Sequence, residues 1–412
     1  MASSTSSAKA APEQKAANQT SSVAITMFCV LLVSYVLMAA DRYLFPVLAT
    51  DVRKDFNFSL PVTALLTTIF TAGLGLAGLA TGYLLARYSR KTVILIGIAI
   101  FSGATALTTV ATGFFSMLVV LAAQGIGMSM LATSMFALAA SYFSNNRTAA
   151  IGSVNFCYGI GGWLGPRVTG FLRTSYGTWH APMLYFGAAG FVMIVVIMAT
   201  VRPWFSETQQ AAQTKADMGG AETLMNRNTI ILTILSLIHG LSMYGFLGMY
   251  PTFLRDELHY TPGQAGAVVS FFGLGALTSI FGGWLGDKLA PRAVLSSSLF
   301  IIAALGYVFY MQDLSMLMRE VLTCIYGIVG SAVLYVNLAG CHVRALRRSL
   351  SSKGSGMFVT SLYAGGAFGG YFLGKLVAPL GGYQHASEIS MTLTCLIGAV
   401  LALALRPSDM SV

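Results

Sequence analysis

The sequence predicts an all-α membrane protein in which twelve transmembrane helices form two six-helix repeats. Only 9% of its 412 residues are charged and 56% are hydrophobic, whereas soluble domains carry about 25% charged residues. Apolar runs of about 20 residues follow one another, the length that a helix needs to cross about 30 Å of hydrocarbon. The two halves also repeat each other. These features exclude a soluble enzyme, a disordered chain and a disulfide-stabilised secreted domain.

The apolar runs define the predicted spans, and one long polar stretch separates six spans on either side of it. The expected regions are a disordered cytoplasmic tail (1–22), an N-terminal six-helix bundle (23–201), a cytoplasmic linker (202–227), a C-terminal six-helix bundle (228–406) and a cytoplasmic tail (407–412). The spans are roughly 24–50, 60–86, 91–111, 114–143, 149–173, 181–201, 228–254, 262–286, 292–312, 316–343, 354–377 and 386–405.

The positions of lysine and arginine predict the orientation. Most of these residues fall in the loops on the side that holds both chain ends, which is the pattern of cytoplasmic loops. The N- and C-termini are therefore expected to be cytoplasmic, in a multi-pass protein of the inner (plasma) membrane. The net charge of +10 then reports topology, so we expect the lipid bilayer and no nucleic acid as a partner. A monomer is expected.

Glycines and a few polar residues recur in both halves. Near the start of each half, Pro46 and Asp51 match Pro251 and Asp256 at one constant offset. Later in each half, another constant offset relates Gly162, Gly165 and Gly170 to Gly366, Gly369 and Gly374. Secondary transporters use such a duplication of six-helix units to build a site at the bilayer midplane.

A loop motif after the second span of each half carries a family resemblance. The segment from Gly283 to Arg292 reads GWLGDKLAPR, which resembles the G-x-L-a-D-r-x-G-r-k signature of major facilitator superfamily transporters. The resemblance covers nearly all of the chain after residue 23 and implies the major facilitator fold. It also implies that Asp287 and Arg292, with Arg87 and Arg90 of the N-terminal copy, belong to the cytoplasmic gate. In that N-terminal copy, Ala86 occupies the acidic position.

The fifth span contains GGWLGPRVTG from Gly161 to Gly170. It is similar to the G-x-x-x-G-P-x-x-G element of proton antiporters in the superfamily. Two interpretations of Gly165 and Pro166 remain: an antiporter element, or simple packing, because glycines four apart let helix backbones approach closely. The antiporter pattern would also place an arginine in the fourth span, where this chain has Leu121.

The first span ends in Asp41-Arg42-Tyr43, followed by an apolar run. This pair resembles the first span of the anion:cation symporter branch of the superfamily. It is also similar to spinster-like and to organophosphate- or hexuronate-type members. The resemblance implies an anionic cargo but names no substrate.

Four ionisable residues lie inside predicted spans: Asp41, Arg42, Arg167 and His239. A charge at membrane depth costs at least about 2.5–3.5 kcal/mol, so it needs an internal partner or a wet cavity. The repeat places uncharged residues at the positions equivalent to Asp41, Arg42 and Arg167. The fold therefore does not require these charges, which favours a role in a site over a cluster that only fixes helix packing.

Asp41 and Arg42 are neighbours and point about 100° apart on a helix, so each needs its own partner. The simplest hypothesis pairs Asp41 with Arg167 and leaves Arg42 free for an anionic substrate, because a guanidinium fork fits a carboxylate or phosphate. Burial favours a neutral carboxyl group and a nearby arginine favours a charged one. Asp41 is therefore predicted to couple transport to protons. His239 is either a packing residue or a second proton or substrate contact.

Uncharged polar residues in or near the inner spans complete the predicted site. The candidate substrate contacts are Arg42, Arg167, His239, Tyr43, Gln124, Asn155, Tyr158, Tyr244, Asn337 and Tyr363. Span 7, with two glycines before Pro251, is predicted to be a moving outer gate. Arg319 and Glu320 are predicted to form an exposed pair at the membrane surface. No catalytic residue, metal site or cofactor is indicated, since the five cysteines lack CxxC spacing.

These observations predict a secondary active transporter that moves a small carboxylate-type anion together with protons by alternating access. One alternative is a proton-coupled efflux antiporter for drugs or metabolites. Another is a non-transporting membrane sensor. An enzyme is not expected, because nucleophile and metal motifs are absent from the sequence.

Overall fold

The computed structural model describes residues 7–142, 147–206, 221–347 and 350–410, and nearly all of them are helical. The first half comprises α1 (Ser7–Asp41), α2 (Leu44–Phe56), α3 (Leu60–Thr68), α4 (Phe70–Arg87), α5 (Arg90–Leu107), α6 (Phe114–Tyr142), α7 (Arg147–Tyr176), α8 (His180–Thr200) and the short α9 (Pro203–Ser206).

The second half comprises α10 (Arg227–Asp256), α11 (Pro262–Ala276), α12 (Ser279–Lys288), α13 (Pro291–Val308), α14 (Met316–Tyr326), α15 (Val336–Arg344), α16 (Ser351–Val377), α17 (Tyr383–Ser387) and α18 (Thr394–Ala402). Two π-helical segments, Gly327–Tyr335 and Glu388–Leu393, join α14 to α15 and α17 to α18 without a break.

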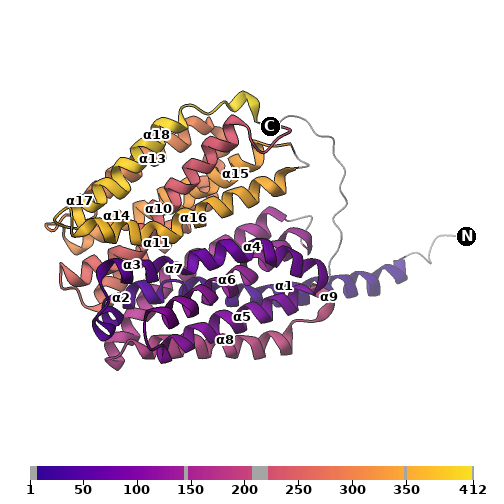
Figure 1. Cartoon of the computed structure of the whole chain (residues 1–412). Helices are drawn as coiled ribbons and strands as arrows, with labels where there is room; N and C mark the ends of the chain where they lie inside the picture. The colour runs from indigo at the N-terminus through magenta and orange to yellow at the C-terminus, as the bar shows by residue number, and fades with distance from the viewer. Residues whose placement is uncertain (1–6, 143–146, 207–220, 348–349, 411–412) are drawn as a thin grey trace, which may run out of the picture.

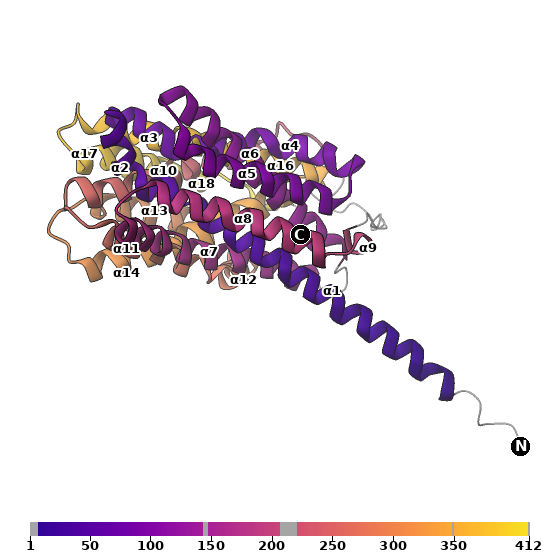
Figure 2. The ribbon, with the colours of Figure 1, turned by 90° about the horizontal axis from the view of Figure 1, so that it is seen from below.

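The helices run side by side, with the first half of the chain on one side and the second half on the other (Figure 1). Both chain ends and α9 lie toward one end of the bundle, while α2 and α17 lie at the opposite end (Figures 1 and 2). We name these the Asp287 end and the Asp51 end, after residues at the C-terminal ends of α12 and α2.

Each predicted span coincides with one helix or with consecutive helices. Within the described residues, nine helices are long and apolar enough to cross a membrane, or ten if α11 and α12, bent by 44°, form one span. The other two predicted spans are α7 and α16, with 30 and 27 residues. These helices are rich in glycine and polar residues, because they pack against other helices at the seams between the halves.

The first span is broken at Arg42 and Tyr43, between α1 and α2. Pro46 explains the break. It has no N–H to donate to the carbonyl of Arg42, four residues earlier, and its ring crowds that carbonyl. Asp41 is the last residue of α1, and Arg42 and Tyr43 form the break before α2 begins at Leu44.

The expected disordered tail differs from the structure over residues 7–22, where α1 already begins at Ser7. This segment is rich in alanine, and it extends an existing helix, so its turns need no new nucleation. Figure 2 shows this part of α1 projecting beyond the bundle. In the linker, residues 207–220 lie outside the described residues, and Ala221 pairs with Leu346 in an isolated β-bridge.

Close helix contacts join the two halves at the seam between α7 and α11. A methyl group added at Gly273 would overlap the backbone of Gly162 and Trp163, and one at Gly266 would overlap the carbonyl of Pro166. Nearer the Asp51 end, a methyl group at Gly170 would lie 2.9 Å from the Cα of Gly263. The repeated glycines thus let the backbones touch, which supports the packing interpretation of the Gly165-Pro166 element.

We expect Gly273→Ala to lower the free energy of unfolding by about 1–3 kcal/mol, because the added methyl group forces two backbones apart. Thermal unfolding of the purified protein measures this change. Gly283→Ala in α12 is the matched control, since its nearest neighbour would be Val336 Cγ1 at 3.8 Å. Equal melting temperatures for the two variants would contradict the tight seam.

Candidate functional site

The guanidinium group of Arg42 lies in a cage of aromatic side chains from both halves. Its carbon lies 5.3 Å from the ring centre of Phe70, 5.6 Å from that of Tyr158, 5.2 Å from that of Tyr244 and 5.6 Å from that of Tyr363. Nη1 donates a hydrogen bond to the hydroxyl of Tyr158 at 3.3 Å, and Nη2 donates to that of Tyr244. Because α4, α7, α10 and α16 all contribute, the cage depends on how the halves meet.

Arg42 lines a cavity of about 90 Å³ between the two halves. The lining combines tyrosine, amide and hydroxyl groups with methionine and aliphatic side chains. Its members are Tyr35, Met38, Arg42, Leu74, Ala132, Phe136, Asn155, Tyr158, Met243, Tyr244, Ala276, Ser279, Ser331, Tyr335, Val336 and Tyr363. Arg42 is the charged member of this lining, so it determines which charge the cavity attracts.

Within the described residues, Arg42 has no carboxylate partner. Its Nε is buried without a hydrogen-bond partner. Aromatic faces attract a cation but do not neutralise it. The cavity therefore holds a net positive charge, and a guanidinium fork in this setting can bind a carboxylate or phosphate in a bidentate manner.

Asp41 points away from the cavity and toward α5 and α6. It is 1% exposed. Its Oδ2 accepts hydrogen bonds from Thr105 Oγ1 and Gln124 Nε2, each at 2.8 Å, and Gln124 also donates to Thr105 at 3.0 Å. The carboxyl group is thus held by neutral donors. It can gain or lose a proton without breaking an ion pair.

The hypothesised Asp41–Arg167 ion pair does not form in this structure. Arg167 lies at the seam between α7 and α11, where its Nε donates to Ser270 Oγ at 2.8 Å. The guanidinium carbon lies 5.2 Å from the Trp163 ring and 5.4 Å from the Phe271 ring. Asp41 faces α5 and α6 and Arg167 faces α11, so each charge is compensated by a separate set of neutral groups.

Comparison with known proteins identifies the family. The profile of the Major Facilitator Superfamily matches residues 31–370 and 233–410. This chain belongs to the major facilitator superfamily. It is therefore a multi-pass membrane transporter with the major facilitator fold.

Individual relatives are distant. The uncharacterized MFS-type transporter YceJ of Bacillus subtilis is 23% identical over 272 residues, which cover 66% of this chain and 69% of that protein. The hexuronate transporter of the same organism is 22% identical over 277 residues, covering 63% and 64%. The crystal structure of a bacterial homologue of the human lysosomal transporter Spinster, titled inward-facing and unoccupied, shares the fold with a TM-score of 0.69 at 16% identity. The match covers 93% of this chain and 95% of that one.

Among the other predicted contacts of this transporter, Asn155, Tyr158, Tyr244 and Tyr363 line the central cavity. Tyr43 lines a smaller adjoining pocket with Arg42. Three further residues are absent from the cavity lining. Gln124 binds Asp41, Asn337 donates to the carbonyls of Gly282 and Val333 at 2.9 Å each, and His239 is fully buried.

The predicted gate residues fall at the Asp287 end and along the seam. Asp287 lines a groove of about 1050 Å³ between α1, α7 and α12, which shares Asn155, Ser279 and Val336 with the central cavity. Arg292 donates to the carbonyl of Leu405. Arg87 is exposed and Arg90 is buried. Gly165 and Pro166 pack against α1 and α11, respectively.

Two features were missed or misplaced by sequence reasoning. Phe70 forms part of the Arg42 cage, but an apolar aromatic residue in a span carries no sequence signal for such a role. Arg319 is fully buried rather than exposed. It donates to the carbonyls of Phe309, Met311 and Gln312 at 3.1, 2.6 and 3.1 Å. These carbonyls follow the last turn of α13, which explains how a buried cation is compensated there.

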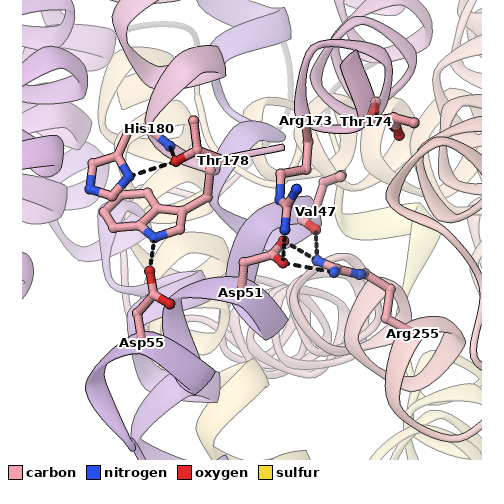
Figure 3. Close-up of polar contacts among 10 residues, drawn as sticks. Val47, Asp51, Asp55, Arg173, Thr174, Thr178, His180 and Arg255 are labelled. Carbon is pink, nitrogen blue, oxygen red and sulfur yellow. Dashed lines mark hydrogen bonds and ion pairs between the residues drawn. The ribbon is translucent and has the colours of Figure 1, made fainter. Parts of the chain in front are cut away.

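A third missed feature is a cluster of ionic side chains at the Asp51 end (Figure 3). Asp51 of α2 accepts hydrogen bonds from Arg173 of α7 and Arg255 of α10. The recurrence of Asp51 as Asp256 in the repeat was visible in the sequence, but it indicated only duplication. Within the described residues, no group of three His, Cys, Asp or Glu side chains could hold a metal ion.

Gln124→Leu removes one donor from Asp41, and we expect it to destabilise the protein by about 1.5–3 kcal/mol, the usual range for a hydrogen bond to a charged group. The cost is expected to be smaller in an Asp41→Asn background, because the carboxylate is then absent. A double-mutant cycle by thermal unfolding measures this coupling. An equal cost in both backgrounds would show that Gln124 does not act through Asp41.

Proposed function

We propose that this chain is a secondary active transporter of a small carboxylate-type organic anion, coupled to protons, in the inner (plasma) membrane. The observation that carries the proposal is the Arg42 guanidinium, which faces a cavity between the two halves without a carboxylate partner among the described residues. A cation at membrane depth is costly to maintain, so a site that keeps one uncompensated favours an anionic ligand.

The cage is suited to release as well as binding. Arg42 donates hydrogen bonds to the hydroxyls of Tyr158 and Tyr244. An incoming carboxylate can take over these donors and accept hydrogen bonds from the displaced hydroxyls. Because the two tyrosines come from α7 and α10, one in each half, the anion contacts both halves at once. This supports alternating access, in which the halves rock around a central site.

The proposed coupling rests on the arrangement of two adjacent residues. Asp41 and Arg42 share the break in the first span but face different surroundings, one the donors of α5 and α6 and the other the cavity. Movement of this break on anion binding would change the environment of the Asp41 carboxyl group and thereby its proton affinity. The hexuronate transporter among the relatives supports an anionic cargo. Cytoplasmic chain ends and a monomeric state remain part of this proposal.

Efflux by proton exchange has less support. The Gly165-Pro166 element that motivated it packs against Ala40 of α1 and Gly266 of α11. This packing accounts for both residues without an antiport role. The positive charge of Arg42 also opposes cationic drugs as cargo.

Arg42→Lys is expected to lower kcat/KM for anion uptake by about 10- to 100-fold, since a point charge replaces a fork that makes two charged hydrogen bonds. Thermal-shift screening with hexuronates, aromatic acids and dicarboxylates first selects a ligand, and uptake into proteoliposomes then measures the effect. Arg167→Lys is the matched control, because Arg167 is an intramembrane arginine away from the cavity. Stabilisation by cationic drugs alone, or normal uptake by Arg42→Lys, would contradict the proposal.

Asp41→Asn is expected to abolish uptake driven by a pH gradient while preserving substrate counterflow, because the amide cannot carry the proton but leaves the Arg42 cage intact. Both assays use the same proteoliposomes, and counterflow shows that the variant is folded and binds cargo. If the variant responds to the gradient as the parent protein does, Asp41 is not the coupling group.

A further inference from the structure

The hydroxyl group of Thr105 in α5 lies within hydrogen-bond distance of two different acceptors. Its Oγ1 is 3.1 and 2.8 Å from Oδ1 and Oδ2 of Asp41, and 2.9 Å from the backbone carbonyl oxygen of Phe101. A hydroxyl group carries a single hydrogen, so it donates to the carboxyl group or to the carbonyl but not to both. Rotation about the Cβ–Oγ1 bond is enough to change from one acceptor to the other.

Gln124 of α6 completes this arrangement. Its amide nitrogen carries two hydrogens and lies 2.8 Å from Asp41 Oδ2 and 3.0 Å from Thr105 Oγ1. One amide hydrogen therefore goes to the carboxyl group and the other to the hydroxyl oxygen. The Thr105 oxygen can accept the amide hydrogen while its own hydrogen points at Asp41, so the three side chains form a closed ring of hydrogen bonds.

The Asp41 carboxyl group depends on these two neighbours. Asp41, Thr105 and Gln124 are 1%, 1% and 4% exposed, and Asp41 lines neither the central cavity nor the smaller pocket beside Arg42. Within the described residues, Asp41 forms no ion pair. Arg42 faces the cavity and Arg167 faces α11. Both protonation states of Asp41 therefore have to be satisfied by Thr105 and Gln124, because buried polar groups need hydrogen-bond partners.

The two protonation states place opposite demands on Thr105. A carboxylate only accepts hydrogen bonds, so Thr105 and Gln124 both donate to it, whereas a protonated carboxyl group carries a hydrogen that needs an acceptor. The Thr105 oxygen, 2.8 Å from Asp41 Oδ2, can accept this hydrogen once its own hydrogen has turned to the carbonyl of Phe101. Its second lone pair still receives the hydrogen of Gln124. Neither state then leaves a hydrogen unpaired in the set, and no heavy atom has to move.

The amide oxygen of Gln124 is the other acceptor that a protonated Asp41 could use. To present this oxygen, the amide group would have to turn over, and it would then give up its present hydrogen bonds to both Asp41 and Thr105. Rotation of a single hydroxyl hydrogen keeps the bond between Gln124 and Thr105. A buried donor without an acceptor is costly, so the geometry favours Thr105 as the acceptor.

We propose that Thr105 is a positioning residue for proton coupling, which donates a hydrogen bond to charged Asp41 and accepts one from protonated Asp41. The proposal rests on the proposed function, which assigns the coupled proton to Asp41. The proton binds to and leaves a carboxyl oxygen of Asp41, while Thr105 keeps its own hydrogen and changes only the direction in which it points. Asp41 can thereby change its charge in place, with the same two partners in both states.

Infrared difference spectra between high and low pH, recorded on the transporter in lipid membranes, test this role. The carbonyl band of protonated Asp41 is the band that Asp41→Asn removes. Thr105→Val is expected to move this band to higher frequency, because the carboxyl hydrogen has lost its acceptor. It is also expected to lower gradient-driven uptake relative to counterflow by about tenfold, the usual effect of one lost hydrogen bond. Thr105→Ser keeps the hydroxyl group and is expected to retain the parent band and the parent uptake.

Thr108→Val is the matched control. Thr108 directly follows α5, about one turn beyond Thr105, and is also 1% exposed. Its hydroxyl group donates to the carbonyl of Ala104 at 3.0 Å. The same chemical change at this position is expected to leave both the Asp41 band and the uptake ratio at the parent values, which separates the role of Thr105 from a general effect of losing a buried hydroxyl group.

Three results would overturn the proposal and leave the proposed function standing. They are an unmoved Asp41 band in Thr105→Val, an equal displacement in Thr105→Ser, and a band that moves in Gln124→Leu but not in Thr105→Val, since the amide oxygen would then be the acceptor. If the spectra contain no band that Asp41→Asn removes, the assignment of the coupled proton to Asp41 is wrong, and this proposal is wrong with it.

Discussion

Every charge at membrane depth in this transporter has to be compensated by protein groups, because hydrocarbon offers none. For the charged residues predicted inside the spans, the compensating groups among the described residues are neutral. Arg42 is compensated by aromatic rings and tyrosine hydroxyls, Asp41 by a threonine and a glutamine, and Arg167 by a serine hydroxyl and two aromatic rings. A charge held by neutral partners keeps its sign available to a ligand or a proton, whereas a closed ion pair does not.

Pro46 connects this constraint to the backbone. It breaks the first span at Arg42 and Tyr43, directly after Asp41. On an unbroken helix the two side chains would still diverge, but they would share one rigid segment. In the proposed function, this break is the joint through which anion binding at Arg42 changes the environment of Asp41.

Ionic pairs instead join the two halves at the Asp51 end. Asp51 of α2 pairs with Arg255 of α10, and Arg53 of α2 pairs with Asp256 of α10. At the seam between α7 and α11, the same halves meet through glycine backbones. The glycine contacts set how closely the two halves approach each other.

The sequence by itself determined the class of the protein, its spans, its repeat and the few charges that need an explanation. Low charge and long apolar runs leave no alternative to transmembrane helices, and the Asp287 motif was sufficient to indicate the superfamily. The candidate residues Arg42, Asn155, Tyr158, Tyr244 and Tyr363 were also found this way, because polar groups are rare in spans.

Only the tertiary structure decided which partner each charge has. Asp41 was expected opposite Arg167, and instead binds Thr105 and Gln124. Asp51 pairs with Arg173 and Arg255, which its place near a loop did not indicate. The physical reason is that membrane helices are apolar on nearly every side. Lipid and protein interior are equally apolar, so the periodicity that shows the buried face of a soluble helix is largely absent. The rotation of each helix, and hence the contacts of its polar residues, follows from packing against distant segments.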